Sequence, residues 1–150
     1  LEGAGIRAAT MHGSYVPNKI FDETISYVTG EIDSFSSTYD ADSESAPNLT
    51  QVVGTYAGLR SDNHQVTVTV DAAGTLSGHS TDRCTFTGTL SPRPKGNVFQ
   101  ISMTFRDDAC RQGTETVTGV AFYDTARHRL YSAALNHART TSFLFLGRKQ

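Results

Sequence analysis

The residues best suited to chemistry by type lie at positions 79–83, where His79, Ser80 and Asp82 are close in sequence. A serine nucleophile needs a base within reach that a third group orients, and such groups normally come from separate segments. The Gly-x-Ser-x-Gly turn of many hydrolases is also absent. We therefore interpret this loop as polar surface, and we expect no catalytic residues and no enzymatic activity.

The carboxylates form two groups of the kind that metal or acid–base chemistry uses. Asp107 and Asp108 are adjacent, which is typical of a solvated turn. Asp40, Asp42 and Glu44 alternate as in a calcium loop, but the central glycine and the distal bidentate glutamate of such a loop are missing. We expect no metal ion and no cofactor.

The basic residues are few and scattered. His128 and His137 lie in consecutive predicted turns, each beside arginines, and would form either a small basic patch at one end of a barrel or ordinary solvated turns. The chain has 13 basic and 15 acidic residues and a net charge of −2. No stripe of lysine and arginine is present, which argues against nucleic-acid binding.

Alternating polar and apolar residues predict strands through most of the chain. Val66, Val68 and Val70 alternate with Thr67 and Thr69, a pattern typical of a half-buried strand. The predicted strands are 9–16, 24–28, 54–58, 64–70, 75–78, 84–90, 98–105, 115–123, 128–135 and 140–146, with a weaker candidate at 32–39. Residues 143–146 are apolar on both faces and predict a central strand covered on both sides.

These patterns predict an all-β fold: a small antiparallel β-barrel or sandwich of about eight strands, with one short helix near residues 47–53. Residues 46–150 form the predicted barrel domain. Residues 1–45 contribute N-terminal strands and an acidic loop, packed on the barrel or continuous with it.

The two cysteines are Cys84, at the start of one predicted strand, and Cys110, beyond the end of the next. If Ser91 pairs with Val98, Cys84 lies opposite Phe105, five residues before Cys110. A disulfide then requires the intervening loop to fold back. Spacing alone leaves open a disulfide or two free thiols, whereas a zinc site would need further ligands.

Several segments resemble the C-terminal half of an uncharacterised family of exported lipoproteins from proteobacteria, of the beta-proteobacterial type. They include CTFTGTL at 84–90, TGVAFYD at 118–124, and residues 54–58, 92–93, 97–99, 110 and 134–147. The resemblance implies export to the periplasm, outer membrane or cell surface, and a disulfide between Cys84 and Cys110. No lipobox cysteine is present, so a lipid anchor would belong to a part of the precursor absent from this chain.

Three functions follow as alternatives for an exported barrel. The first is a non-enzymatic binding or antigenic role at the envelope, with host antibodies or envelope proteins as partners and a monomeric chain. The second is a lipocalin-like carrier of a small apolar ligand, and the third is an enzyme with a site built from loops. The side chains that would line a carrier's cavity, or otherwise fill the core, are Phe86, Phe99, Met103, Phe105, Phe122, Tyr131, Phe143 and Phe145.

Overall fold

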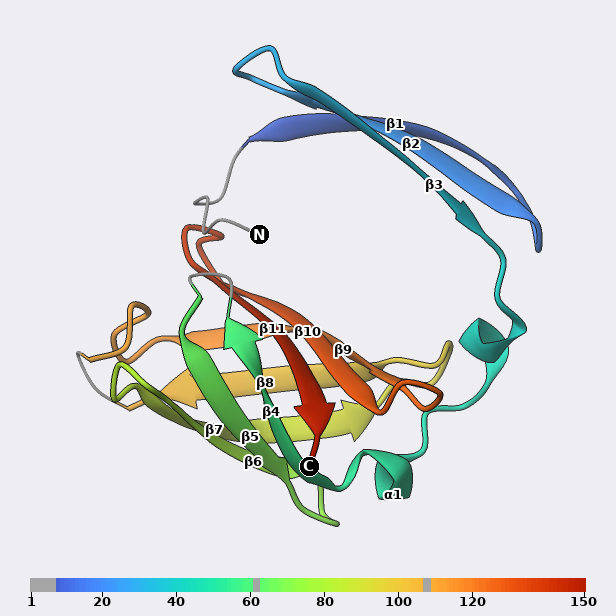
Figure 1. Cartoon of the computed structure of the whole chain (residues 1–150). Coiled ribbons are helices and arrows are strands. Elements are labelled where there is room, and N and C mark those ends of the chain that lie inside the picture. The colour runs from blue at the N-terminus through green and yellow to red at the C-terminus, as the bar shows by residue number, and fades with distance from the viewer. Residues whose placement is uncertain (1–7, 61–62, 107–108) are drawn as a thin grey trace.

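The computed structural model describes residues 8–60, 63–106 and 109–150. They form a closed antiparallel barrel of eight strands and a separate sheet of three strands (Figure 1). The predicted all-β fold, with one short α-helix in the predicted place, is confirmed.

The barrel is a simple meander in which each strand pairs with the next and the last pairs with the first. Pairing of the first and last strands leaves no open edge. The strands are β4 (Gly54–Arg60), β5 (Gln65–Val70), β6 (Thr75–Ser80), β7 (Thr85–Pro92), β8 (Phe99–Phe105), β9 (Thr116–Asp124), β10 (Arg129–Asn136) and β11 (Ser142–Lys149).

The alternation seen in the sequence sorts residues between the inside and the outside of the barrel. In β5, Val66, Val68 and Val70 are buried, whereas Thr67 and Thr69 lie on the outer side. Glycine allows close approach of neighbouring strands, because a Cβ at Gly119 would collide with the backbone of Ala133 on β10. The inward positions therefore form one continuous core.

The short helix α1 (Leu49–Val52) closes one end of the barrel. Asn48 caps it by accepting a hydrogen bond from the backbone N–H of Thr50 at 3.0 Å. Val52 is fully buried, and the hydroxyl of Tyr56 on β4 donates to its carbonyl at 2.6 Å. The helix thus covers the apolar interior that would otherwise meet water.

A disulfide joins Cys84 to Cys110, with Cα atoms 4.5 Å apart, and both residues are buried. The assumed strand register was wrong by two residues, because Ser91 pairs with Gln100 and not with Val98. Because of this shift, the loop between β8 and β9 folds back over a shorter distance than the assumed register requires. The disulfide joins this loop to the start of β7, at the end of the barrel opposite α1.

The remaining strands, β1 (Ala9–Val16), β2 (Ile20–Tyr27) and β3 (Ile32–Thr38), form their own antiparallel sheet. They do not continue the barrel sheet. A segment that includes the 3₁₀ helix η1 (Ala41–Glu44) leads from the sheet to α1, and the sheet stands away from the barrel (Figure 1). Every residue of β1 and β3 is exposed.

No helix among the described residues is both long and apolar enough to span a membrane.

Candidate functional site

A partly buried charge cluster lies at the barrel end opposite α1. The side chain of Arg60 is only 3% exposed and donates to the carboxylate of Asp82 at 2.6 Å. The hydroxyl of Ser80 donates to the same carboxylate, and the ring of His64 lies 3.9 Å from it. Burial alone would raise the pKa of Asp82, but the hydrogen bonds from Ser80 and Arg60 and the charge of Arg60 lower it to about 2.

This arrangement is suited to holding strands together. Ser80 donates to a carboxylate and not to a histidine, and Asp82 is too acidic to act as a base near neutral pH. The prediction that residues 79–83 form polar surface was wrong for Ser80, which is 6% exposed, whereas His79 does lie on the outside. Arg60 and His64 come from another segment, so residue spacing alone did not indicate them.

A second polar network closes the same end. The side-chain amide of Asn136 donates to Glu115 and to Thr140, at 3.0 and 2.9 Å, and its oxygen accepts from the backbone N–H groups of Thr140 and Thr141. The buried Gln112 donates to the carbonyl of Ser142 at 2.9 Å. These bonds fasten the turns between strands, which is a structural role.

The other predicted polar groups do not assemble into a site. Asp40 caps η1 by accepting from the backbone of Asp42 at 3.0 Å, and no group of three potential metal ligands occurs among the described residues. His128 precedes β10 and His137 follows it, so they lie at opposite ends of that strand and form no common patch. Residues 107 and 108 lie outside the described part of the chain.

Aromatic rings pack against one another inside the barrel. The ring centroid of Phe86 lies 5.5 Å from that of Phe105 and 5.2 Å from that of Phe143, and the last two are 5.9 Å apart. Rings at these distances are in contact. Six of the eight side chains proposed to line a cavity are buried in this core: Phe86, Phe99, Met103, Phe105, Phe143 and Phe145.

The other two, Phe122 and Tyr131, lie on the outside of the barrel, contrary to the prediction. They face each other across β9 and β10, with ring centroids 6.2 Å apart. Each alternates with buried neighbours, Tyr123 and Leu130, and this alternation puts them on the opposite face. Aromatic character alone predicts burial, whereas the phase of a residue within its strand decides which face it occupies.

The prediction that the last strand is covered on both faces was also wrong. Phe143 and Phe145 point inward, but Leu144 and Leu146 are 44% and 39% exposed. The sequence signal was real, since both faces are apolar. Among the described residues, nothing covers the outer face of β11.

These outer residues belong to a continuous apolar surface, here called the apolar wall. One row runs across four strands, because Phe122, Tyr131, Leu146 and Leu59 are successive register partners. The members of the wall are Leu59, Val120, Phe122, Tyr131, Ala133, Leu135, Leu144 and Leu146. Contiguous exposed apolar surface of this kind often marks an interaction site.

The opposite side of the barrel is polar, and it is here called the hydroxyl wall. Its central row runs through successive register partners across six strands: Thr55, Thr69, Ser77, Thr87, Thr104 and Thr116. Hydroxyls at both ends of the row are hydrogen-bonded in pairs, Thr55 with Thr69 and Thr104 with Thr116. The two sides of the barrel therefore differ sharply in chemistry.

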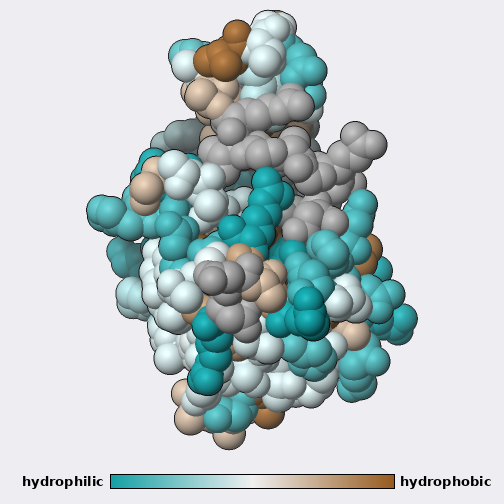
Figure 2. Space-filling view, turned by 90° about the vertical axis from the view of Figure 1, so that its left-hand side faces the viewer, coloured by the Kyte–Doolittle hydropathy of each residue, from teal (hydrophilic) through white to brown (hydrophobic). Residues whose placement is uncertain are grey.

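The β1–β3 sheet is also amphipathic, but less sharply, because its more polar face carries the exposed side chains of Val16, Ile20 and Ile32. One face of the sheet is apolar, although it also carries Glu23 and Asp33. The apolar side chains that the register places together on this face are Ala9, Met11, Tyr15, Phe21, Ile25, Tyr27 and Phe35. Tyr15 is 72% exposed and Met11 is 58% exposed. Hydrophobic surface is visible on this part of the molecule, at the top of Figure 2.

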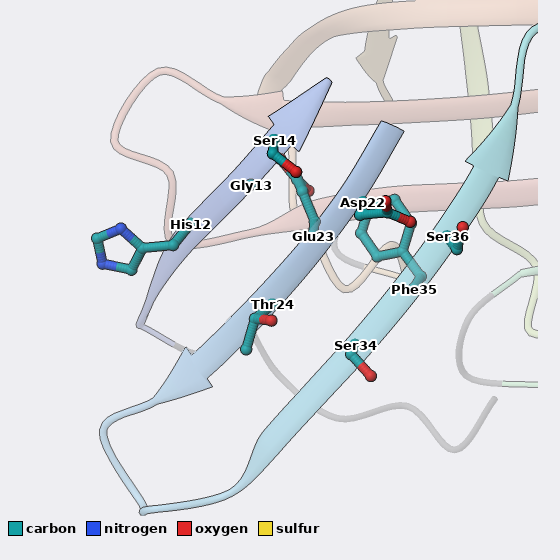
Figure 3. Close-up of a pocket in the computed structure, with 9 residues that line it drawn as sticks. All are labelled: His12, Gly13, Ser14, Asp22, Glu23, Thr24, Ser34, Phe35 and Ser36. Atoms are coloured by element: carbon teal, nitrogen blue, oxygen red, sulfur yellow. The ribbon is translucent and has the colours of Figure 1, made fainter. Parts of the chain in front are cut away.

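A shallow hollow of about 550 Å³ lies across the three strands of this sheet. Most of its polar lining comes from the other face of the sheet, which carries His12, Ser14, Asp22, Thr24, Ser34 and Ser36. The ring of His12 points out past the edge of β1, away from Asp22 (Figure 3). Because the two do not converge, the hollow offers no acid–base pair.

No protein-family model, no curated protein and no solved structure matches this chain. The resemblance to exported lipoproteins therefore stays a prediction. The buried Cys84–Cys110 disulfide is compatible with an oxidising compartment outside the cytosol.

Proposed function

We propose that this chain is an exported, non-enzymatic barrel that acts through its outer surface, as a binding or antigenic protein of the periplasm, outer membrane or cell surface. The observation that carries this proposal is the apolar wall. If the whole outer surface of the barrel faced only water, we would expect all of it to be polar, like the hydroxyl wall of the same barrel.

Two further features support a surface role over the alternatives. The rings of Phe86, Phe105 and Phe143 pack together where a carrier would hold its ligand. The buried polar groups of the barrel end are engaged in bonds between strands, which favours a structural role for them over a catalytic one. The disulfide supports export.

Site-specific photocrosslinking in cells of the source organism tests the proposal. A benzoylphenylalanine at Leu146, on the apolar wall, should give a covalent adduct with a protein. The matched control at Gln100, which is exposed on the outer side of β8, should give none. Equal adducts at both positions, or none at either, would contradict a role for the apolar wall.

Native mass spectrometry of the protein isolated from the same cells tests the carrier alternative. We expect the mass of the disulfide-bonded polypeptide, or a whole multiple of it, with no small molecule bound. A small apolar molecule that copurifies at one equivalent, and is lost on unfolding, would instead favour the carrier.

A further inference from the structure

The described residues expose two apolar surfaces, and we infer that they bind each other between two copies: the apolar face of the β1–β3 sheet of one copy docks on the apolar wall of the other. The inference rests on the proposed function, because it names the partner of the apolar wall. The twofold arrangement contains the contact twice, since each copy has one sheet and one wall.

The β1–β3 sheet needs a cover to be stable. A sheet that is hydrophobic on one face gains its stability by burying that face against another element. Here every residue of β1 and β3 is exposed, and the ring contact between Phe21 and Phe35, with centroids 5.9 Å apart, lies on the uncovered apolar face. A surface that is apolar and broad, like the sheet itself, would supply that cover.

Charge indicates that the cover is the barrel. Residues 8–45 contain seven acidic residues and one basic residue, a formal charge of −6, whereas residues 46–150 contain eleven basic and seven acidic residues, a charge of +4. Arg129 and Arg148 are direct register partners beside the apolar wall, where like charges repel. Glu23 and Asp33, on the apolar face of the sheet, have the sign that would relieve this repulsion.

The connection between sheet and barrel favours a second copy over the chain's own barrel. The N–H of Tyr39 donates to Lys19 within the sheet at 2.8 Å, and the carbonyl of Ser43 accepts from Asn97 of the barrel at 3.0 Å. These hydrogen bonds thus anchor the sheet and the barrel to chain segments that lie within a few residues of η1. In this arrangement the sheet stands off its own barrel (Figure 1), and side chains of both apolar surfaces are exposed among the described residues.

The area is sufficient for a stable dimer. Three strands of seven or eight residues, at about 4.8 Å between strands and about 3.4 Å per residue, cover a footprint of roughly 340 Å². Two contacts, each burying both partners, remove roughly 1,400 Å² from water. This value lies within the range of about 1,200–2,000 Å² for stable interfaces.

Sedimentation equilibrium of the purified, oxidised protein from about 1 to 200 µM tests the inference. The expected species is a dimer of twice the chain mass of 16.2 kDa, in reversible equilibrium with monomer. A monomer throughout the range, whether extended or compact by X-ray scattering, would overturn the inference.

Two variants test whether the contact between copies lies on the proposed surfaces. Tyr15→Glu on the sheet and Leu144→Lys on the apolar wall should each raise the dimer dissociation constant at least about tenfold. The matched controls are His12→Glu, on the other face of β1, and Gln100→Glu, on the outer side of β8. Both should stay within about twofold of wild type, and circular dichroism should show that all four variants keep their strand content.

Mixing the two impaired variants makes the test specific. In a mixed dimer one contact carries both changes, which have opposite charge, and the other contact carries neither. Dimers should therefore return on mixing. Loss of dimer in Tyr15→Glu but not in Leu144→Lys would mean that sheets pair with sheets, and would overturn the inference.

The crosslinking at Leu146 separates this inference from the proposed function. An adduct with a different protein, together with a monomer in solution, would overturn the second-copy inference and leave the surface role intact. No adduct and no dimer would contradict both.

Discussion

The disulfide gives the most direct prediction of stability. The bridge joins residues separated by 26 positions. In the chain-entropy model, closing a loop of that size stabilises the folded protein by about 3.5 kcal/mol. Replacing both cysteines, in Cys84→Ala/Cys110→Ala, should lower the free energy of unfolding by about that amount, which is a large part of the usual total of about 5–15 kcal/mol.

Urea unfolding measures this loss. The protein contains no tryptophan and six tyrosines, so far-ultraviolet circular dichroism and tyrosine fluorescence are the suitable signals. With a slope of about 1.5–2 kcal/mol per molar urea, the midpoint should fall by about 2 M.

The reduced wild-type protein is the internal control. Its midpoint in dithiothreitol should fall to that of the double variant, and the double variant should not respond to dithiothreitol. A midpoint of the double variant within about 0.5 M of the oxidised wild type would refute the reasoning that the bridge restricts the unfolded chain.

Three further predictions concern the barrel. Phe143→Ala should cost about 3–5 kcal/mol in urea unfolding, because the ring is 1% exposed and central to the aromatic core. Gly119→Ala should cost about 2 kcal/mol or more in the same assay, because its Cβ would meet the carbonyl of Ala133, while Thr118→Ala on the outer side should change stability by less than about 0.5 kcal/mol. The lowered pKa of Asp82, about 2 in the folded protein against 3.8 ordinarily, stabilises the fold above pH 4, and this contribution is lost as the pH falls from about 4 to 2. Asp82→Asn should therefore destabilise the protein at pH 7 by on the order of 1–2 kcal/mol and flatten the pH dependence of thermal unfolding in that window.

The sequence predicted the strands well because their alternation is regular. In β8, Phe99, Ile101, Met103 and Phe105 alternate with polar residues, and all four are buried. The prediction failed where both phases of a strand are apolar, as in β11. Such a pattern indicates that both faces avoid water, but it does not say what covers the second face.

The polar clusters could not be predicted from the sequence, for a different reason. Arg60 and Asp82 are 22 residues apart and meet because β4 and β6 both flank β5 at one barrel end. A local pattern carries no information on which loops share an end. His128 and His137 show the same limit, because the length of β10 separates them.

By itself, the sequence determined the all-β class, the approximate position of most strands and the choice of inward residues in the most regular of them. Period-two alternation is a local property of extended chain, so it can be read residue by residue. Only the tertiary structure decided that β11 pairs with β4 to close the barrel, that the aromatic rings meet inside it, and that the apolar wall and the apolar face of the β1–β3 sheet are exposed in the part of the chain that the structure describes. These features depend on contacts between segments far apart in the chain, and those contacts form only when the whole sheet closes.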